Sequence, residues 1–353
     1  MATFPLRVVE RRMEATDTAS LWLAVPSDLK ATFAHRPGQF VTVEAEIEGE
    51  TLARQYSLSS SPQDEHLRIT VKKIPGGRVS TWLVDEVEIG QLVAVAPPRG
   101  RFLGALDRPH RVLLLAAGSG IAPILPIARH LAADHDVTLV YGNRSRADIA
   151  LHDEVRNLAK ATVELALTRP DESWDGLRGR IDAELIAARY PRWRDSDLPV
   201  QVYLCGPEGM MDGAEAFLAA NGVAKAAIRR ESFDLVLDDA DDEPPIEVAC
   251  PDGAGVAGDC TELKALVGGE SHTVNVEAGE SLLAALLRAG ADVPFSCQEG
   301  TCSSCIVKLR AGTVAVRPGI LKTLRREDLD EGLVLACLAR PRTVSVTIDF
   351  DEI

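Results

Sequence analysis

The chain has 353 residues, of which 46% are hydrophobic, and a formal net charge of −15. This length exceeds what one hydrophobic core ordinarily supports, so we expect several domains. The negative charge argues against a nucleic-acid partner, because nucleic acids select basic surfaces. The most apolar stretch, residues 111–133, is interrupted by glycines and prolines, and the first fifteen residues lack a signal-peptide pattern. We therefore expect no membrane span and a cytoplasmic location.

Four segments of different character follow one another along the chain. Residues 1–107 alternate short apolar runs with proline and glycine turns, which is typical of a small antiparallel β-barrel. Residues 108–237 alternate apolar strands with helical segments, such as 123–133 and 152–160, which predicts an α/β domain with a parallel sheet. Residues 238–260 are rich in Asp, Pro and Gly without periodicity, and we interpret them as an acidic linker. Residues 261–353 mix strands with a short helix, which predicts an α+β domain.

The cysteine spacing in the last segment is specific. Four of the seven cysteines follow the pattern C-x4-C-x2-C with one distant cysteine, namely Cys297, Cys302, Cys305 and Cys337. This spacing is typical of plant-type ferredoxins, in which these thiolates hold a [2Fe-2S] cluster. A zinc site or disulfides are the alternatives, but zinc sites usually pair two short cysteine hairpins and disulfides are unusual without secretion. We expect no chemical role for Cys250 and Cys260.

A second group of motifs lies in the predicted barrel. In RQYSLSSSP (Arg54 to Pro62) an arginine, an aromatic residue and small hydroxyls alternate at the end of a strand. Alone, this pattern could equally belong to an ordinary edge strand. Downstream, KKIPGGRVSTW offers backbone and hydroxyl donors at Gly76, Gly77 and Ser80, which could bind a phosphate. The second motif makes a phosphate-binding site more plausible than an ordinary edge strand.

Two glycine-rich turns lie in the predicted α/β domain. AAGSGIAP (116–123) runs a strand into Gly118-Ser119-Gly120, which lets a backbone approach a pyrophosphate, and Pro123 suits the first helical turn. LCGPEGMM (204–211) is a second turn at the carboxyl end of a predicted strand, where ligands of open parallel sheets bind. No acid after DVTLVYGN is placed to hold a ribose 2′-hydroxyl, whereas Arg144 and Arg146 could meet a 2′-phosphate. The choice between NADH and NADPH stays open, with a lean to NADPH.

Taken together, RPGQF, RQYSLSS, GGRVSTW, GSGIAP, YGNR, CGPEGMM, ESF and the cysteine loop resemble the ferredoxin–NADP reductase-like flavin oxidoreductases with a C-terminal plant-type ferredoxin. The resemblance extends to reductase components of phenylacetyl-CoA epoxidase and 3-ketosteroid 9-alpha-hydroxylase. It implies a flavin-binding β-barrel, a nicotinamide-binding α/β domain and a β-grasp ferredoxin domain. It also implies FAD rather than FMN, because members with SLSSSP followed by VK and GG look like FAD binders.

The resemblance also implies roles for individual residues. Ser57 should lie near flavin N5 and Cys205 near the nicotinamide ring, and with Glu231 they are the predicted catalytic residues. Glu231 and Phe233 match an acid-x-aromatic segment that lies by the flavin in related flavohaemoglobins. The implied cofactor-binding residues are Arg54, Gln55, Tyr56, Ser57, Lys72, Gly77, Val79, Ser80, Gly118, Ser119, Gly120, Pro123, Asn143, Arg144, Cys205, Gly206, Pro207, Met210 and Phe233.

The implied activity is that of an electron-transfer reductase. NAD(P)H delivers two electrons as hydride to the flavin, which returns them singly to the cluster for a partner oxygenase, hydroxylase or epoxidase. Two alternatives stay open. A self-contained oxidase or quinone reductase would consume NADH rapidly without a partner protein, and a redox sensor would reduce cytochrome c slowly despite full cofactor loading. The identity of the acceptor, its substrate and the oligomeric state do not follow from the sequence.

Overall fold

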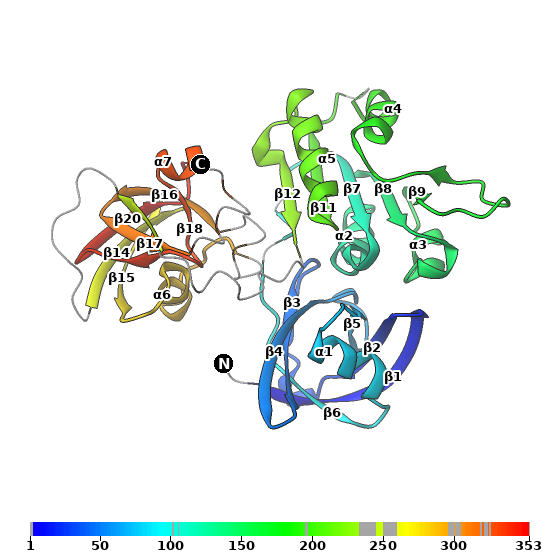
Figure 1. The fold of residues 1–353 in the computed structure, drawn as a ribbon, viewed down its shortest axis with the longest axis horizontal. Helices are drawn as coiled ribbons and strands as arrows, with labels where there is room; N and C mark the ends of the chain where they lie inside the picture. The colour runs from blue at the N-terminus through cyan, green and yellow to red at the C-terminus, as the bar shows by residue number, and fades with distance from the viewer. Residues whose placement is uncertain are drawn as a thin grey trace. The chain divides into compact units, whose positions relative to one another are not determined.

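The computed structural model describes residues 3–100, 102–104, 106–194, 197–232, 245–249, 260–295, 300, 305–317, 320, 324 and 326–352. The chain divides into two compact units, residues 1–232 and 233–353. Unit 1 contains a six-stranded antiparallel sheet and a six-stranded parallel sheet, and unit 2 contains two smaller sheets (Figure 1). Within the described ranges, the helices are all too short or too polar to cross a membrane.

The first half of unit 1 is a six-stranded antiparallel sheet in the order β4-β3-β6-β1-β2-β5. Its strands are β1 (Phe4–Ala15), β2 (Thr18–Ala24), β3 (Phe40–Ile47), β4 (Glu50–Ser57), β5 (Leu67–Lys72) and β6 (Leu92–Val95). A bridge between Leu58 and Ile69 joins the continuation of β4 to β5, so the sheet closes on itself around an apolar core. A short helix, α1 (Arg78–Thr81), follows β5. The predicted antiparallel barrel is confirmed.

The second half of unit 1 is a six-stranded parallel sheet in the order β10-β9-β8-β7-β11-β12 (Figure 1). Its strands are β7 (Arg111–Ala117), β8 (Asp136–Asn143), β9 (Ala161–Leu167), β10 (Leu177–Arg178), β11 (Val200–Cys205) and β12 (Ile228–Glu231). Alternate residues of β7 point to opposite faces. Leu114 packs with α2 (Ile121–Leu131) and α3 (His152–Arg156), and Leu113 packs with α4 (Ala183–Arg194) and α5 (Glu208–Ala220). Helices therefore cover both faces, as predicted.

Some boundaries differ from the sequence prediction. The helix expected at 152–160 ends at Arg156, and Lys160 adopts a left-handed conformation with φ +59° that no helix continues through. The helix expected from Pro123 begins at Ile121, so Pro123 lies inside its first turn. The chain also forms β10, α4 and β12, which the sequence analysis did not anticipate, because their polar sequences carry little apolar periodicity.

Unit 2 contains a five-stranded mixed sheet in the order β15-β14-β20-β16-β18 and a three-stranded sheet in the order β13-β17-β19. Its elements are β13 (Ile246–Ala249), β14 (Cys260–Val267), β15 (Glu270–Glu277), α6 (Leu282–Arg288), β16 (Ile306–Ala311), β17 (Thr313–Val316), α7 (Arg326–Asp330), β18 (Leu333–Leu335), β19 (Arg340–Pro341) and β20 (Ser345–Asp349). The Ser281 hydroxyl caps α6 by accepting a hydrogen bond from the Ala284 amide, and Leu282, Leu283 and Leu286 enter the core. The predicted α+β fold is confirmed.

The segment predicted as an acidic linker, residues 238–260, is not wholly irregular. Strand β13 lies inside it and pairs with β17 of unit 2 from Ile246–Val316 to Ala249–Thr313. Only Val248 of this strand is buried. A four-residue edge strand with one buried side chain is too short to give a periodic signal, which explains why the pattern missed it. Residues 238–244 and 250–259 lie outside the described residues.

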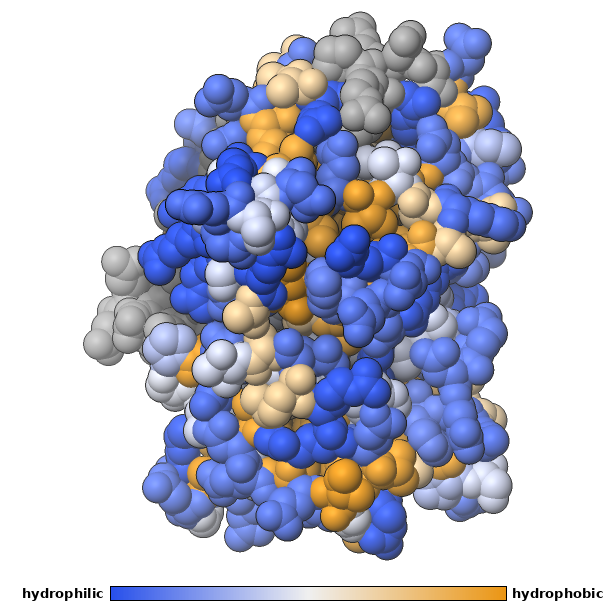
Figure 2. Space-filling view, turned by 90° about the vertical axis from the view of Figure 1, so that its right-hand side faces the viewer, coloured by the Kyte–Doolittle hydropathy of each residue, from blue (hydrophilic) through white to orange (hydrophobic). Residues whose placement is uncertain are grey.

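The described surface exposes few large hydrophobic side chains. Those that are exposed are Met13, Ile74, Ile89, Leu92 and Val344. On the face drawn in Figure 2, hydrophobic side chains form small groups among hydrophilic ones. Permanent interfaces usually leave a broad apolar patch on the isolated chain, so this face gives no argument for a permanent partner.

Candidate functional site

The RQYS motif forms the last four residues of β4, which lies against β5 and α1. Arg54, Gln55 and Tyr56 are partly buried, and burial raises the pKa of the Tyr56 phenol, so this side chain is neutral at physiological pH. The hydroxyl oxygen of Ser57 is buried and has no hydrogen-bond partner among the described residues. Buried polar atoms normally have a partner. The Ser57 hydroxyl is therefore available to a bound group, as the predicted flavin contact requires.

The turn before α1 requires glycine. A Cβ on Gly77 would lie 2.4 Å from Ile74 Cγ1 and 2.5 Å from Ser80 Oγ. The Ser80 hydroxyl donates to the Gly77 carbonyl at 3.1 Å and accepts from the Ile74 amide at 3.4 Å. This hydroxyl thus holds the turn together, and its contact with a phosphate stays a prediction. Val79 is buried, and Lys72 at the end of β5 pairs with Asp17 at 3.5 Å.

The two glycine-rich turns of the α/β half meet at the carboxyl ends of β7 and β11. A Cβ on Gly120 would lie 2.0 Å from the carbonyl oxygen of Cys205, so the first turn packs on the backbone of the second. A Cβ on Gly206 would lie 2.8 Å from Met210 Cε. Ser119 lies in the first turn, and Pro207 precedes α5. Only glycine allows this approach, and the contact makes the two motifs one surface.

Three more predicted residues lie at the same edge of the sheet. Cys205 ends β11 and is fully buried, with Ala116 of β7 on one side and Glu231 of β12 on the other. Glu231 is 3% exposed, and Asn143, at the end of β8, is also buried. The structure therefore brings Cys205, Glu231 and Asn143 to the place where parallel sheets bind ligands. Phe233 lies outside the described residues.

In unit 2 the structure places two of the four predicted cluster ligands next to each other. Cys305 precedes β16 and Cys337 follows β18, and the Ala336 amide donates to the Cys305 carbonyl at 2.9 Å. Their exposed fractions are 2% and 7%. Gly300 adopts φ +83°, and a Cβ there would lie 2.3 Å from Leu338 Cδ1, so Gly300 lies beside the residue that follows Cys337. Two buried thiols from neighbouring strands fit a two-iron cluster. Cys297 and Cys302 lie outside the described residues.

Comparisons with known proteins agree with this arrangement. Family models match residues 5–103 as an oxidoreductase FAD-binding domain, 114–216 as an oxidoreductase NAD-binding domain and 266–342 as a 2Fe-2S iron-sulfur cluster binding domain. The chain is 35% identical to the ferredoxin reductase component of 3-ketosteroid-9-alpha-monooxygenase from Rhodococcus rhodochrous, over 96% of this chain and 94% of that protein. The chain belongs to the ferredoxin reductase family of flavoproteins. This ferredoxin reductase is therefore an NAD(P)H-dependent oxidoreductase with FAD and a [2Fe-2S] cluster.

Two further similarities cover almost the whole ferredoxin reductase. It is 32% identical to one of the subunits of 1,2-phenylacetyl-CoA epoxidase from Escherichia coli strain K12, over 99% of both chains. The solved structure of phthalate dioxygenase reductase matches it with a TM-score of 0.57 at 24% identity, over 99% of this chain and 98% of that chain. The structural match shows a shared three-domain architecture and leaves the residue roles as predictions.

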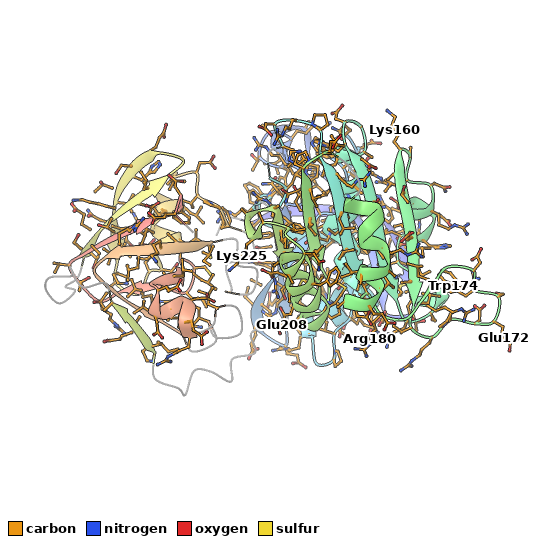
Figure 3. All side chains as sticks on the ribbon, turned by 90° about the horizontal axis from the view of Figure 1, so that it is seen from above. Lys160, Glu172, Trp174, Arg180, Glu208 and Lys225 are labelled. Carbon is orange, nitrogen blue, oxygen red and sulfur yellow. The ribbon has the colours of Figure 1, made fainter. Side chains whose placement is uncertain are left out.

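The two arginines of the ferredoxin reductase that could meet a 2′-phosphate already have carboxylate partners. Arg144 pairs with Asp148 at 3.4 Å and Asp17 at 3.7 Å. Arg146 pairs with Asp171 at 3.1 Å and lies over Trp174, which is labelled in Figure 3. The arginine side chains are 57% and 42% exposed, so solvent screens these pairs and a phosphate could compete for either. The ion pairs of these two arginines therefore do not strengthen the prediction that NADPH is preferred over NADH.

Tyr141 of β8 is a residue that the sequence analysis did not single out, because it looks like one more apolar strand residue. Its side chain is fully buried, and its hydroxyl donates to the Gly118 carbonyl at 3.1 Å. Gly118 adopts φ +56°, so this bond holds the first residue of the Gly118–Gly120 turn in a left-handed conformation. Burial raises the pKa of Tyr141, and the phenol therefore remains a donor at neutral pH.

The bond from Tyr141 to Gly118 can be tested by the Tyr141→Phe substitution. We expect it to lower the free energy of unfolding by about 1 kcal/mol, the usual net value of one hydrogen bond. We also expect it to weaken NAD(P)H binding several-fold, because the turn is no longer fixed. Urea unfolding and equilibrium nucleotide titration measure the two effects. Unchanged nucleotide affinity would mean that the turn keeps its shape without this bond.

Proposed function

We propose that this ferredoxin reductase takes electrons from NAD(P)H and passes them through its flavin and its cluster to a separate oxygenase. The observation that carries the proposal is the contact of Gly120 with the Cys205 carbonyl, in a turn that also lies against β5 of the flavin barrel. The nicotinamide and flavin sites that we propose would thus adjoin. When bound, FAD accepts two electrons at once and releases them one at a time, which a nicotinamide cannot do.

The residues of unit 1 would bind and orient the two nucleotides. We propose that Arg54 binds a flavin phosphate, and that the buried Ser57 hydroxyl donates a hydrogen bond to the flavin ring. Cys205 would line the nicotinamide pocket, with Glu231 beside it on β12. The backbone at Gly118–Gly120 would hold the pyrophosphate, since glycines let it come close. In unit 2, Cys305 and Cys337 would hold iron together with Cys297 and Cys302.

Ser57→Ala tests the flavin contact. Without its cofactor the variant should be as stable as the parent chain, because the hydroxyl has no protein partner to lose among the described residues. With FAD bound, we expect flavin reduction by NAD(P)H to slow by about tenfold, because the ring loses a positioning hydrogen bond. Stopped-flow absorbance measures the rate, and calorimetry measures the stability of the cofactor-free protein. A wild-type reduction rate would remove Ser57 from the site.

The partner is proposed from the relatives. Their names describe components of a 3-ketosteroid-9-alpha-monooxygenase and of a 1,2-phenylacetyl-CoA epoxidase, so we propose a hydroxylating or epoxidising enzyme as acceptor. Reconstitution with a purified oxygenase component tests this proposal. We expect NAD(P)H consumption to depend on the oxygenase and its substrate and to match product formation. Rapid NAD(P)H oxidation by oxygen alone, unaffected by any partner, would favour the self-contained oxidase. The expected cytoplasmic location stays a prediction.

A further inference from the structure

Arg68 of β5 is a buried arginine that the proposed chemistry does not use. Its side chain is 5% exposed, and its Nε donates to Ser59 Oγ at 3.1 Å while Nη2 donates to the Ser59 carbonyl at 2.7 Å. The guanidinium also lies 5.2 Å from the centre of the Trp22 ring. Ser59 belongs to the RQYSLSSSP motif, two residues after Ser57. Arg68 therefore binds the backbone and the side chain of Ser59, in the segment that continues from Ser57 of the proposed flavin site.

The same guanidinium reaches into the α/β half of unit 1. Its Nη1 and Nη2 donate to the two carboxylate oxygens of Glu154 on α3, at 2.5 and 3.0 Å. This is the forked geometry that gives the strongest arginine–carboxylate pairs. Burial by itself would raise the pKa of Glu154, but the hydrogen bonds from Arg68 and Arg129 outweigh it, so the pKa lies below its ordinary value. Glu154 is therefore charged at neutral pH.

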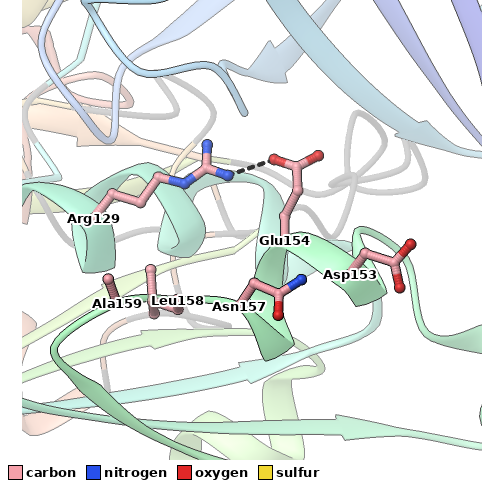
Figure 4. A pocket seen from close by; sticks show the side chains of 6 residues that line it. All are labelled: Arg129, Asp153, Glu154, Asn157, Leu158 and Ala159. Atoms are coloured by element: carbon pink, nitrogen blue, oxygen red, sulfur yellow. Dashed lines mark hydrogen bonds and ion pairs between the residues drawn. The ribbon is translucent and has the colours of Figure 1, made fainter.

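Glu154 also binds α2, the helix that follows the Gly118–Gly120 turn. Its Oε2 accepts from Arg129 Nη2 at 2.6 Å, and Arg129 lies on α2, the helix that starts immediately after Gly120. Figure 4 shows the two side chains facing each other at a hollow of about 460 Å³ on this unit. The Glu154 carboxylate thus joins two arginines. One is Arg68, which binds Ser59 of the RQYSLSSSP motif, and the other is Arg129, on the helix that follows the Gly118–Gly120 turn.

We propose that Arg68, Glu154 and Arg129 form a positioning triad that fixes the nicotinamide-binding half of unit 1 against the flavin-binding half. The proposal rests on the proposed function, because it concerns the alignment of the two nucleotides. Hydride transfer demands near-contact of the donor and acceptor atoms, and a misplacement of about 1 Å can cost a factor of about 100 in rate. A bidentate, largely buried pair holds two rigid bodies in one orientation more firmly than exposed pairs do. None of the three residues needs to touch either nucleotide.

The test compares Glu154→Gln, which keeps the shape of the side chain and removes its charge, with Glu164→Gln. Glu164 of β9 pairs with Arg189 of α4 at 3.3 Å and is similarly buried, but both partners lie within the α/β half. We expect Glu154→Gln to slow saturating flavin reduction by NAD(P)H about tenfold, to leave the apparent Kd within about twofold, and to weaken the flavin–nicotinamide charge-transfer absorbance. Glu164→Gln should leave all three unchanged.

A second measurement does not depend on activity. In cofactor-free protein, the Ser59 amide, which donates to the Arg68 carbonyl, should exchange its hydrogen faster in Glu154→Gln than in Glu164→Gln. If Glu154→Gln does not fold, Arg129→Met removes only the outer arginine and should give the same pattern more weakly. A wild-type reduction rate and charge-transfer band, with only a lower melting temperature, would overturn the proposal. If the unsubstituted protein is not reduced by NAD(P)H, the proposed function fails instead.

Discussion

Replacing Cys337 by alanine is expected to remove the iron–sulfur cluster and to stop electron delivery beyond the flavin. Cys337 is buried beside Cys305, and a two-iron cluster needs all four thiolates. Iron should fall from about two atoms per chain to a small fraction of that, and cytochrome c reduction should fall about 100-fold. Flavin reduction by NAD(P)H should continue, because the site in unit 1 is untouched. Iron analysis measures the loss of the cluster, and stopped-flow absorbance measures the reduction of the flavin and of cytochrome c.

The matched control is Cys260→Ala. Cys260 begins β14, outside the C-x4-C-x2-C loop, and we expect its replacement to leave iron content and cytochrome c reduction at wild-type values. Loss of iron from both variants would mean that any cysteine change unfolds unit 2. Full iron content in Cys337→Ala would contradict the assignment of the fourth ligand.

Replacing Gly120 by alanine is expected to slow the reduction of the flavin by NAD(P)H. The new Cβ would lie 2.0 Å from the Cys205 carbonyl oxygen, a backbone atom that cannot rotate away. One of the two turns must therefore move, and we expect flavin reduction by NAD(P)H to fall about 100-fold. FAD and iron contents should stay unchanged, since the substitution alters neither the RQYS motif of the barrel nor the cysteines of unit 2. Chemical reduction by dithionite should still bleach the flavin and reduce the cluster.

Gly213→Ala in α5 is the control for this substitution. A Cβ at Gly213 would meet nothing within 4 Å, and alanine favours a helix over glycine. We expect this variant to gain about 0.5 to 1 kcal/mol in the free energy of unfolding and to react with NAD(P)H normally. If Gly120→Ala is reduced by NAD(P)H as fast as the parent chain, the nucleotide does not bind at these turns.

The sequence allowed the architecture to be predicted because its apolar runs are long and its turns carry glycine and proline. RVLLLAAG and DVTLVYGN became β7 and β8, and the segments that follow each of them became helices. The strands that escaped prediction, β10, β12 and β13, have only two to four residues each, and the longer helix α4 carries little apolar periodicity. Strand β12, with the sequence IRRE, is held by parallel pairing with β11, which precedes it in the chain on the other side of α5. Local patterns carry no information about such a neighbour.

Some residues of the candidate site could likewise be predicted from the sequence, and others could not. Gly120 and Cys205 could be found from motifs, because close approach of backbone to a nucleotide requires particular residues at fixed spacing. Arg68 and Glu154 could not. In the strand LRITVK, Arg68 looks like an outward-facing polar residue, but Ser59 and a carboxylate that α3 brings from a distant segment bind its guanidinium. Tyr141 escaped for a similar reason, since its partner is the Gly118 carbonyl of a different strand end.

The most direct test of the central claim is an anaerobic titration of the purified protein with NADH and, separately, with NADPH. Visible absorbance follows the flavin, and low-temperature EPR follows the cluster. We predict that one or both donors bleach the flavin and that the signal of a reduced two-iron cluster grows to about one unpaired spin per chain. The better donor then decides the nicotinamide preference. A flavin that bleaches without any cluster signal would contradict the proposed path of electrons from the flavin to the iron–sulfur domain.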